Sequence, residues 1–199
     1  MSEPMRQWPI PTTEGVTQTS GGDPDLAAVR AAQRDPAEFA ALYHRYLDPI
    51  YSYAFYQLGD HHDAEDATAR TFMAALRAIG TFRNEGASFR AWLFRIARNT
   101  IANAHRTRAR RRTEPMDAIP LEPHAPDADP AGLALRAEDA RRIRAAVAAL
   151  PDDRRQVVLL RFADGLSARE IGEVLDRSAG AVRVLLHRAL KELAGQLNP

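Results

Sequence analysis

Residues 166–193 read LSAREIGEVLDRSAGAVRVLLHRALKEL, and this stretch decides the fold of the C-terminal part of the chain. The run Ser167-Ala168-Arg169-Glu170 is a capping-box pattern, in which a serine and a glutamate close the start of a helix. Asp176-Arg177-Ser178 predicts a tight turn. A longer helix follows, with apolar residues at steps of three and four: Val182, Leu186, Ala189, Leu193 and Leu197. A short capped helix, a turn and a longer helix are typical of a helix-turn-helix, whose second helix lies in a major groove.

The second helix of this motif would turn a polar and basic face outward. That face carries Ala181, Arg183, Val184, His187, Arg188 and Lys191. Arg183 and Arg188 are the best candidates for contacts with bases or phosphates, because a guanidinium binds guanine edges and phosphates through two hydrogen bonds. The alternative is an ordinary helical hairpin with a solvated basic face. Capping and turn spacing together favour the helix-turn-helix.

Helical periodicity also accounts for most of the remaining chain. Apolar residues recur at helical spacing over about residues 35–58, 63–79, 88–108, 133–150 and 151–164. Gly59 and Asp164-Gly165 are expected to end helices, and Ser88 can cap one. No run alternates with a sustained period of two, which argues against a sheet. We therefore predict an all-α protein.

The charge distribution divides the chain further. The total is 27 Lys and Arg against 26 Asp and Glu, but residues 83–112 carry nine Arg against the single Glu85. Residues 113–132 are rich in proline and acidic side chains, a composition that does not pack a core. We predict a flexible tail over 1–25, a helical domain over 26–112, an acidic linker over 113–132 and a second helical domain over 133–199. Two basic blocks on one chain indicate two surfaces that face a polyanion.

The first basic block interleaves aromatic and cationic side chains. Phe82, Phe89, Trp92 and Phe94 alternate with the arginines of residues 83–112. This combination suits single-stranded nucleic acid, since bases stack on aromatic rings and phosphates need neutralising. An apolar stripe at helical spacing is more often part of a core, so we expect Phe89 and Trp92 to be mainly structural. The polar loop and the arginine face would then contact the nucleic acid.

Several classes of protein and site are disfavoured. The chain has no cysteine, which excludes a disulfide scaffold and thiolate metal sites. No apolar run suggests a membrane helix or a signal peptide, so a soluble cytoplasmic protein is expected. His62 and Asp66 lie four residues apart and could share a helix face as metal ligands, but no third ligand is evident. Acidic residues at a helix start, or a docking patch, explain this segment better. No phosphate loop, nucleophile elbow or zinc-protease motif occurs, so neither an enzyme nor a cofactor is expected.

The ordered motifs resemble a known family. Thr81-Phe82-Arg83, followed by Phe89, Trp92-Leu93, Arg95-Ile96-Ala97 and Asn99, resembles the promoter-melting segment of sigma-70-type initiation factors of bacterial RNA polymerase, in particular the short extracytoplasmic-function (ECF) group. Asp63-Ala64-Glu65-Asp66 with Phe72 is similar to the stretch that docks on the clamp helices of the largest polymerase subunit. Residues 150–193 are similar to the second domain of the family, which reads the upstream promoter element.

The resemblance implies a dissociable specificity subunit without a catalytic site. Its expected partners are core RNA polymerase, promoter DNA and an anti-sigma factor, and the acidic linker would lie in a basic channel of the polymerase. Polymerase contacts would come from Asp63, Glu65, Asp66 and Phe72. The minus-10 element would meet Arg83, Asn84, Ser88, Arg95, Arg98, Asn99, Asn103 and Arg106. The minus-35 element would meet Arg169, Ser178, Ala181, Arg183, Val184, His187 and Arg188.

Two other functions compete with this interpretation. One is a stand-alone helix-turn-helix regulator whose N-terminal helices sense a signal or dimerise. Such a protein would need neither Trp92 nor the basic loop and helix. The other is an interaction module that occupies polymerase without directing initiation. Ala69-Arg70 stands where the family usually shows a Gln-acid pair, which leaves room for that possibility.

Overall fold

The computed structural model describes residues 23–111 and 141–197. The described residues form helices joined by turns, and none of them lies in a strand. The helices are α1 (Leu26–Arg34), η1 (Pro36–Glu38), α2 (Phe39–Leu58), α3 (His61–Ala78), η2 (Ile79–Thr81), α4 (Phe89–Arg111), α6 (Asp152–Asp164), α7 (Ala168–Leu175) and α8 (Ala179–Leu197). Residues 141–149 are helical as well. The predicted all-α class is confirmed, whereas the acidic linker at 113–132 and most of the tail lie outside the described residues.

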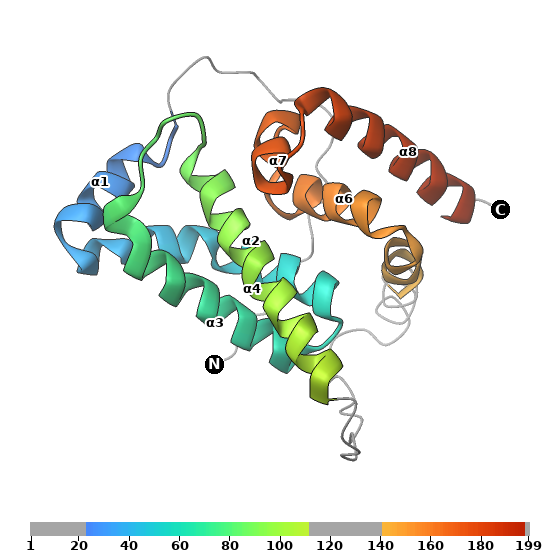
Figure 1. Cartoon of the computed structure of the whole chain (residues 1–199), viewed down its shortest axis with the longest axis horizontal. Coiled ribbons are helices and arrows are strands. Elements are labelled where there is room, and N and C mark those ends of the chain that lie inside the picture. Colours follow the sequence, from blue (N-terminus) through green and yellow to red (C-terminus); the bar gives the residue numbers. More distant parts are fainter. Residues whose placement is uncertain (1–22, 112–140, 198–199) are drawn as a thin grey trace, which may run out of the picture.

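Helices α1 to α4 form the first group, which lies on the left of Figure 1 with α4 across its front. Helix α2 ends at Gly59, whose φ of 73° is left-handed, and the Asp60 carboxylate then accepts a hydrogen bond from the backbone N–H of Asp63 at 2.9 Å. This stop and cap fold α3 back along α2. Their shared core is closed by fully buried side chains of α2 and α4: Leu42, Ile50, Tyr53, Phe89, Leu93 and Phe94. Because the apolar stripe of α4 faces this core, the basic side of the helix faces away from it.

Helices α6 to α8 form the second group and contain the helix-turn-helix. The capping box is confirmed, because Ser167 Oγ accepts from Glu170 N at 3.2 Å while Glu170 Oε2 accepts from Ser167 N at 2.9 Å. Gly172 lets α7 approach the following turn, since a Cβ placed there would lie 2.4 Å from the carbonyl oxygen of Arg177. Asp176 makes the turn at a left-handed φ of 57°. These contacts fix the angle between α7 and α8.

The first described residues add a helix that was not expected. Helix α1 was not recognised from the sequence, and Asp23 and Asp25, the described residues at the end of the predicted tail over residues 1–25 that carry acidic side chains, both make contacts. Asp25 is 1% exposed and accepts hydrogen bonds from Tyr46 Oη and Arg45 Nη1. Asp23 Oδ2 accepts from the first amide of α4, Phe89 N, at 2.6 Å. Both acids therefore belong to the fold. Helix α1 shows only a weak hydrophobic pattern in the sequence, because its buried residues, Val29 and Ala32, are few and small.

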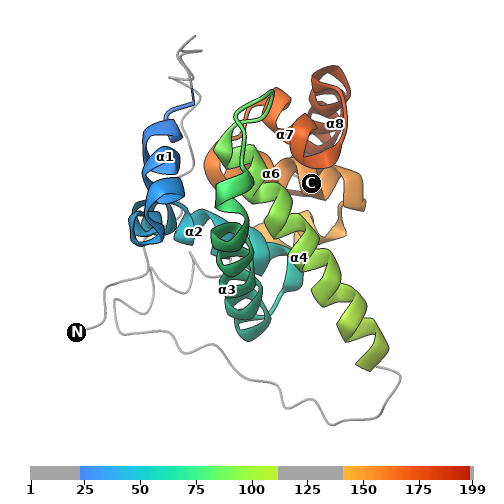
Figure 2. The same ribbon diagram turned by 60° about the vertical axis from the view of Figure 1, so that its left-hand side comes forward.

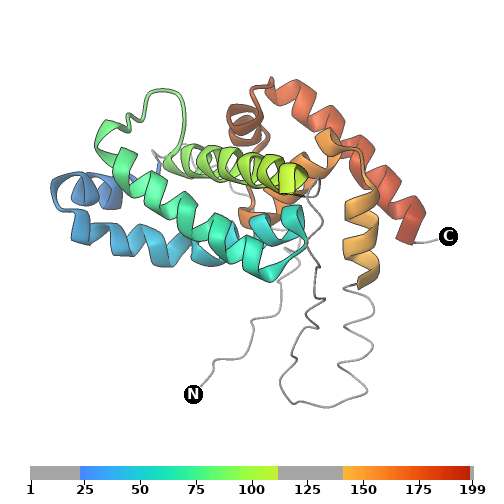
Figure 3. The same cartoon turned by 60° about the horizontal axis from the view of Figure 1, so that its bottom comes forward.

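The two groups of helices pack directly against each other. Helix α7 lies on the N-terminal half of α4, and α6 lies beside α2. Figures 2 and 3 show the adjacency of α7 and α4 from two further directions. No helix in the described part of the chain is both long and apolar enough to cross a lipid bilayer.

Candidate nucleic-acid interface

The outer face of α8 is the first candidate surface. Val182 and Ala189 are fully buried and turn the helix so that Arg183, Val184, His187, Arg188 and Lys191 are exposed. Ala181 is partly buried. Ser178 is exposed at the helix start, where its Oγ accepts a hydrogen bond from Ala181 N at 3.2 Å. Five of the seven residues predicted for the minus-35 contact thus lie in or beside one exposed, basic face.

Arg169, also predicted for this contact, is exposed on α7 and turned elsewhere. Its Nε donates to Glu173 Oε1 at 3.2 Å, and its Nη2 donates to the carbonyl oxygen of Gly86 at 3.4 Å. Gly86 belongs to the loop between η2 and α4. In this structure, Arg169 connects the helix-turn-helix to the first group of helices.

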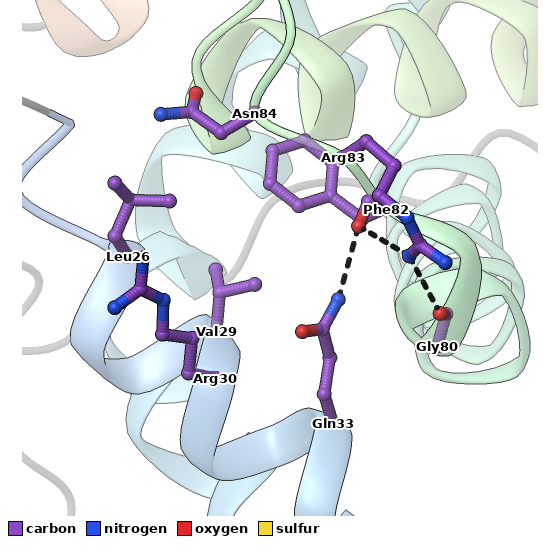
Figure 4. A pocket seen from close by; sticks show the side chains of 8 residues that line it. All are labelled: Leu26, Val29, Arg30, Gln33, Gly80, Phe82, Arg83 and Asn84. Atoms are coloured by element: carbon purple, nitrogen blue, oxygen red, sulfur yellow. Dashed lines mark hydrogen bonds between the residues drawn. The ribbon is translucent and has the colours of Figure 1, made fainter.

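The loop of residues 82–88 forms the second candidate surface, together with α1. A pocket of about 480 Å³ lies between them. Figure 4 shows the residues that line it: Leu26, Val29, Arg30, Gln33, Gly80, Phe82, Arg83 and Asn84. Arg83 folds back on the loop, where its Nη1 donates to the carbonyl oxygens of Gly80 at 3.1 Å and Phe82 at 3.0 Å. Asn84 is exposed at the rim. A volume of this size is in the range that takes a small planar ligand such as a base.

Two side chains of this pocket were missed from the sequence. Gln33 on α1 donates from Nε2 to the carbonyl oxygens of Ile79 and Phe82, at 3.0 Å each, and so holds the base of the loop. Arg30 is exposed one turn earlier on the same helix. The positive charge of Arg30 could have suggested a contact with nucleic acid. The sequence around α1, however, does not show that this helix packs beside a loop some 50 residues later.

The basic face of α4 continues from this loop. Asn99, Asn103 and Arg106 are exposed, and Arg106 donates to Asn103 Oδ1. Arg95 and Arg98 instead reach the second group of helices. Arg95 Nη2 donates to the carbonyl oxygen of Glu173, and Arg98 Nε donates to Gln156 Oε1 at 3.0 Å. The predicted minus-10 face is therefore partly occupied by α6 and α7.

Arg90, which was not among the predicted site residues, connects α4 to Glu170 and Asp164. Its Nη2 lies 2.7 Å from Glu170 Oε2 and 2.8 Å from Oε1, and its Nη1 donates to the carbonyl oxygen of Asp164 at 3.0 Å. Ser88 Oγ donates to Glu170 Oε1 at 2.8 Å and also caps α4 by accepting from Ala91 N at 3.2 Å. Its place in the sequence could have indicated this role, because Arg90 is the second residue of α4 and follows closely on the capping residue Ser88.

Burial and charge shift the titration of these groups. Burial raises the pKa of Asp164 to about 6, in spite of Arg90, and the nearby carboxylates of Asp25 and Glu170 add to the rise. For Glu170, burial is outweighed by hydrogen bonds from the Ser167 backbone and from Arg90, which lower its pKa. Burial disfavours the charged form of Arg90, but Glu170 and Asp164 outweigh it and raise the pKa of the guanidinium. The charged Arg90–Glu170 pair is thus favoured over its neutral form.

The aromatic side chains beside this face belong to the core. Phe89 is fully buried, and its ring centroid lies 5.7 Å from that of Phe82 and 5.5 Å from that of Trp92. Trp92 is partly buried in the same cluster. The expectation that Phe89 and Trp92 are mainly structural is confirmed.

The acidic start of α3 forms a separate surface. Glu65 and Asp66 are exposed, and Asp66 pairs with Arg70 at 2.8 Å. Asp63 is partly buried and pairs with Arg108 of α4 at 3.3 Å. Phe72, expected among the docking residues, is only 5% exposed, and its ring lies 4.8 Å from that of Tyr43. Phe72 therefore packs α3 on α2, and Met73, 53% exposed, is the apolar side chain beside it at the surface.

The metal site that His62 and Asp66 suggested has no counterpart among the described residues. No group of three or more potential ligands from His, Asp, Glu or Cys comes together in residues 23–111 and 141–197. Asp66 is engaged by Arg70.

Comparison with known proteins gives consistent matches. The model of Sigma-70 region 2 matches residues 42–111, and that of Sigma-70 region 4 matches residues 140–193. The ECF RNA polymerase sigma factor BldN of Streptomyces coelicolor is 37% identical over 170 residues, which are 85% of this chain and 64% of BldN. The ECF RNA polymerase sigma factor SigW of Bacillus subtilis is 31% identical over 172 residues, which are 82% of this chain and 90% of SigW. The chain thus spans less than two thirds of BldN and most of SigW.

A solved structure shares the arrangement of helices. The structure of CnrH in complex with the cytosolic domain of CnrY superposes with a TM-score of 0.66 at 25% identity, covering 86% of this chain and 96% of CnrH. The regions that match the family models contain all of α3, α4, α6 and α7, whereas α1 precedes them.

Proposed function

The chain belongs to the ECF family of RNA polymerase sigma factors, which are not enzymes, and on that basis we propose that it binds core RNA polymerase and directs it to promoters. The observation that carries this proposal is the presence of two separate basic surfaces on one chain. One is the exposed face of a capped helix-turn-helix, and the other is the loop and arginine face at the start of α4. A stand-alone regulator would use only the first.

We assign the minus-35 element to the outer face of α8. Arg183, His187 and Arg188 project from one side of a helix that α7 and α6 hold rigidly from behind. A helix of this kind fits a major groove, where arginine reads guanine through two hydrogen bonds. Ser178 at the start of α8 and Arg169 on α7 would contact the neighbouring phosphates.

The minus-10 element is assigned to the loop of residues 82–88 and the exposed polar face of α4. An unstacked base of the non-template strand would enter the pocket between this loop and α1, with Arg83 and Asn84 at its mouth. Asn99, Asn103 and Arg106 would follow the backbone of the adjacent strand. Unstacking costs a few kcal/mol per base, and pocket binding with phosphate neutralisation would offset this without ATP.

Core polymerase would dock on the acidic start of α3. Glu65 and Asp66 are exposed there, with Met73 as a neighbouring apolar contact. Charge complementarity of this kind speeds association and sets orientation. Because the protein would work together with polymerase on DNA, its place of action would be the cytoplasm. We further propose an anti-sigma protein as a partner, since CnrH, which shares the arrangement of helices, was solved in complex with the cytosolic domain of a second protein, CnrY.

The base-capture step can be tested with the double variant Arg83→Ala, Asn84→Ala. Ser88 stays in place, because its hydroxyl caps α4. We expect open-complex formation on a duplex promoter to fall by about 10-fold or more, since the unstacked base loses its pocket. Initiation on a template already melted at the minus-10 element should be spared.

Glu85→Gln in the same loop serves as the control and should behave as the parent protein on both templates. Permanganate footprinting would measure melting, and abortive transcripts would measure initiation. An equal loss on duplex and pre-melted templates would rule out base capture by this loop.

A further inference from the structure

A second pocket lies where α2, α4 and the beginning of α6 meet. Its volume is about 390 Å³, which is toward the lower end of the range for small-ligand sites. Side chains from all three helices line it, among them Tyr53 of α2, Arg98 of α4 and Arg155 of α6. It shares no lining residue with the pocket beside the loop of residues 82–88, so capture of a base does not account for it.

The charges around this second pocket do not balance. Arg155 is paired, because its Nη2 lies 2.7 Å from Asp152 Oδ1. Arg98 is partly buried, and its Nε donates to the neutral Gln156 Oε1 at 3.0 Å. The other end of the Gln156 amide, Nε2, donates to Asp152 Oδ2 at 2.9 Å and so keeps that acid apart from Arg98. Within residues 23–111 and 141–197, the guanidinium of Arg98 therefore has no carboxylate partner.

The lining is also short of hydrogen-bond acceptors. A guanidinium carries five N–H donors, and the two Nη groups of Arg98 meet no acceptor in the described part of the chain. Arg155 Nε, in the wall of the same pocket, is buried and has no partner among the described residues either. Unpaired donors in a buried setting cost free energy. A ligand that supplies acceptors would therefore be favoured here.

Tyr53 adds a buried hydroxyl to the same lining. Its side chain is 1% exposed, and the groups that act on its titration are Gln57, Arg98, Asp152 and Arg155. Burial raises the pKa of Tyr53 to about 12, although Gln57 and the two arginines lower it. The hydroxyl thus keeps its proton at neutral pH and can donate a hydrogen bond to an anion.

These features favour one class of ligand, a small organic carboxylate. One positive charge is left unbalanced, and a carboxylate carries one negative charge at pH 7, whereas a phosphate monoester carries nearly two. The two Nη groups of Arg98 match the two oxygens of a carboxylate. Ile101 of α4, 4% exposed, supplies an apolar part of the lining that suits a hydrocarbon body.

We propose that the pocket between α2, α4 and α6 binds a small organic carboxylate, whose charged group pairs with Arg98 and accepts from the Tyr53 hydroxyl, and whose apolar body lies against Ile101. This site is a property of the chain itself. It requires neither polymerase nor DNA, so it stands apart from the proposed function.

The probe for this site is 4-fluorobenzoate, whose binding to the full-length chain can be followed by ¹⁹F NMR. Two matched probes have the same ring. One is 4-fluorobenzamide, which has no charge, and the other is 4-fluorophenyl phosphate, which has a second charge and a tetrahedral head. At equal ionic strength, 4-fluorobenzoate should bind saturably, and both other probes should bind about five-fold more weakly or less, since neither matches the charge and the fork of Arg98.

Two variants locate the site. Arg98→Gln removes the unbalanced charge and should weaken binding of 4-fluorobenzoate about ten-fold, and Tyr53→Phe removes only the hydroxyl and should weaken it about three-fold. Arg77→Gln, which removes an exposed arginine of α3 outside the pocket, is the matched control and should bind as the parent does. Far-UV circular dichroism and a cooperative thermal transition verify that each variant is folded.

The outcomes separate the parts of the proposal. Absence of saturable binding of 4-fluorobenzoate to the parent, or equal binding of the uncharged amide, would overturn an anion site. Tighter binding of the phosphate than of the carboxylate would overturn the assigned class of ligand. Equal affinity of Arg98→Gln and Arg77→Gln would overturn the assigned place. Failure of the chain to bind core polymerase would contradict the proposed function and leave the result for this pocket standing.

Discussion

Gly172 sets the geometry of the helix-turn-helix at the scale of a single atom. A Cβ at this position would lie 2.4 Å from the Arg177 carbonyl oxygen, and the contact is with backbone of the turn, which cannot rotate away. We expect Gly172→Ala to lower the free energy of unfolding by about 1–3 kcal/mol through overpacking and to weaken duplex binding. Chemical denaturation followed by circular dichroism measures the first effect.

Gly195→Ala is the matched control for that substitution. Gly195 also lies in a helix, α8, but a Cβ there meets nothing within 4 Å. Alanine should therefore raise stability by roughly 0.5–1 kcal/mol through its higher helix propensity. A similar response of the two glycines would show that the close approach of α7 and the turn does not constrain this fold.

Asp164 gives the interface a defined dependence on pH. Burial raises its pKa from 3.8 to about 6, so the folded chain prefers the protonated carboxyl. The stabilisation from this group is fully present below pH 3.8 and is lost as the pH rises toward 6. Asp164→Asn places a neutral side chain of nearly the same shape at this position. It also retains the backbone carbonyl oxygen that accepts the hydrogen bond from Arg90.

The variant should therefore gain stability relative to the parent as the pH rises. We expect the difference in unfolding free energy to grow by about 1–3 kcal/mol between pH 4 and pH 7, with no further growth above pH 7. Thermal melts across this range measure the difference. A constant difference would mean that Asp164 titrates normally and that Arg90 compensates its burial.

At the scale of elements, α1 stabilises the base of the loop of residues 82–88. Gln33 donates two hydrogen bonds, to the carbonyl oxygens of Ile79 and of Phe82, and Phe82 directly precedes Arg83. Gln33→Ala leaves both carbonyls without this donor, so we expect a loss of about 1–2 kcal/mol in stability and weaker melting of duplex promoters. Thermal melts and permanganate footprinting would be the measurements.

Arg34→Ala, the next residue on α1, is the control for this variant. Arg34 is exposed and donates within its own helix, to the carbonyl oxygen of Arg30 at 3.2 Å. It should therefore leave promoter melting unchanged. If Gln33→Ala melts promoters as well as Arg34→Ala does, α1 is not needed to position the loop.

The helices that the sequence revealed are those whose signals are local. The capping box at Ser167, the stop at Gly165 and the apolar stripe of α4 each depend on residues within one or two turns of one another. Helix α1 escaped notice because its burial depends on α2 and on the loop after η2, which are distant in sequence. The burial of Phe72 was not visible for a related reason: an aromatic residue on an acidic helix can face either a partner or the core, and its packing against Tyr43 and Phe39 depends on α2.

At the scale of the whole molecule, the contact between the two groups of helices was beyond sequence reasoning. Periodicity identifies the apolar side of α4, but the partners of Arg90, Arg95 and Arg98 lie 58 to 80 residues away. Those three arginines belong to the basic segment of residues 83–112, whose composition indicates a surface that binds nucleic acid. The structure gives them intramolecular partners.

The central claim is that the chain directs polymerase to its own set of start sites. The most direct measurement reconstitutes core RNA polymerase with the purified chain on sheared genomic DNA of the source bacterium and sequences the 5′ ends of the transcripts. We predict start sites that appear only when the chain is added and that share two upstream sequence elements about 25 base pairs apart. Identical start sites with and without the chain would contradict it.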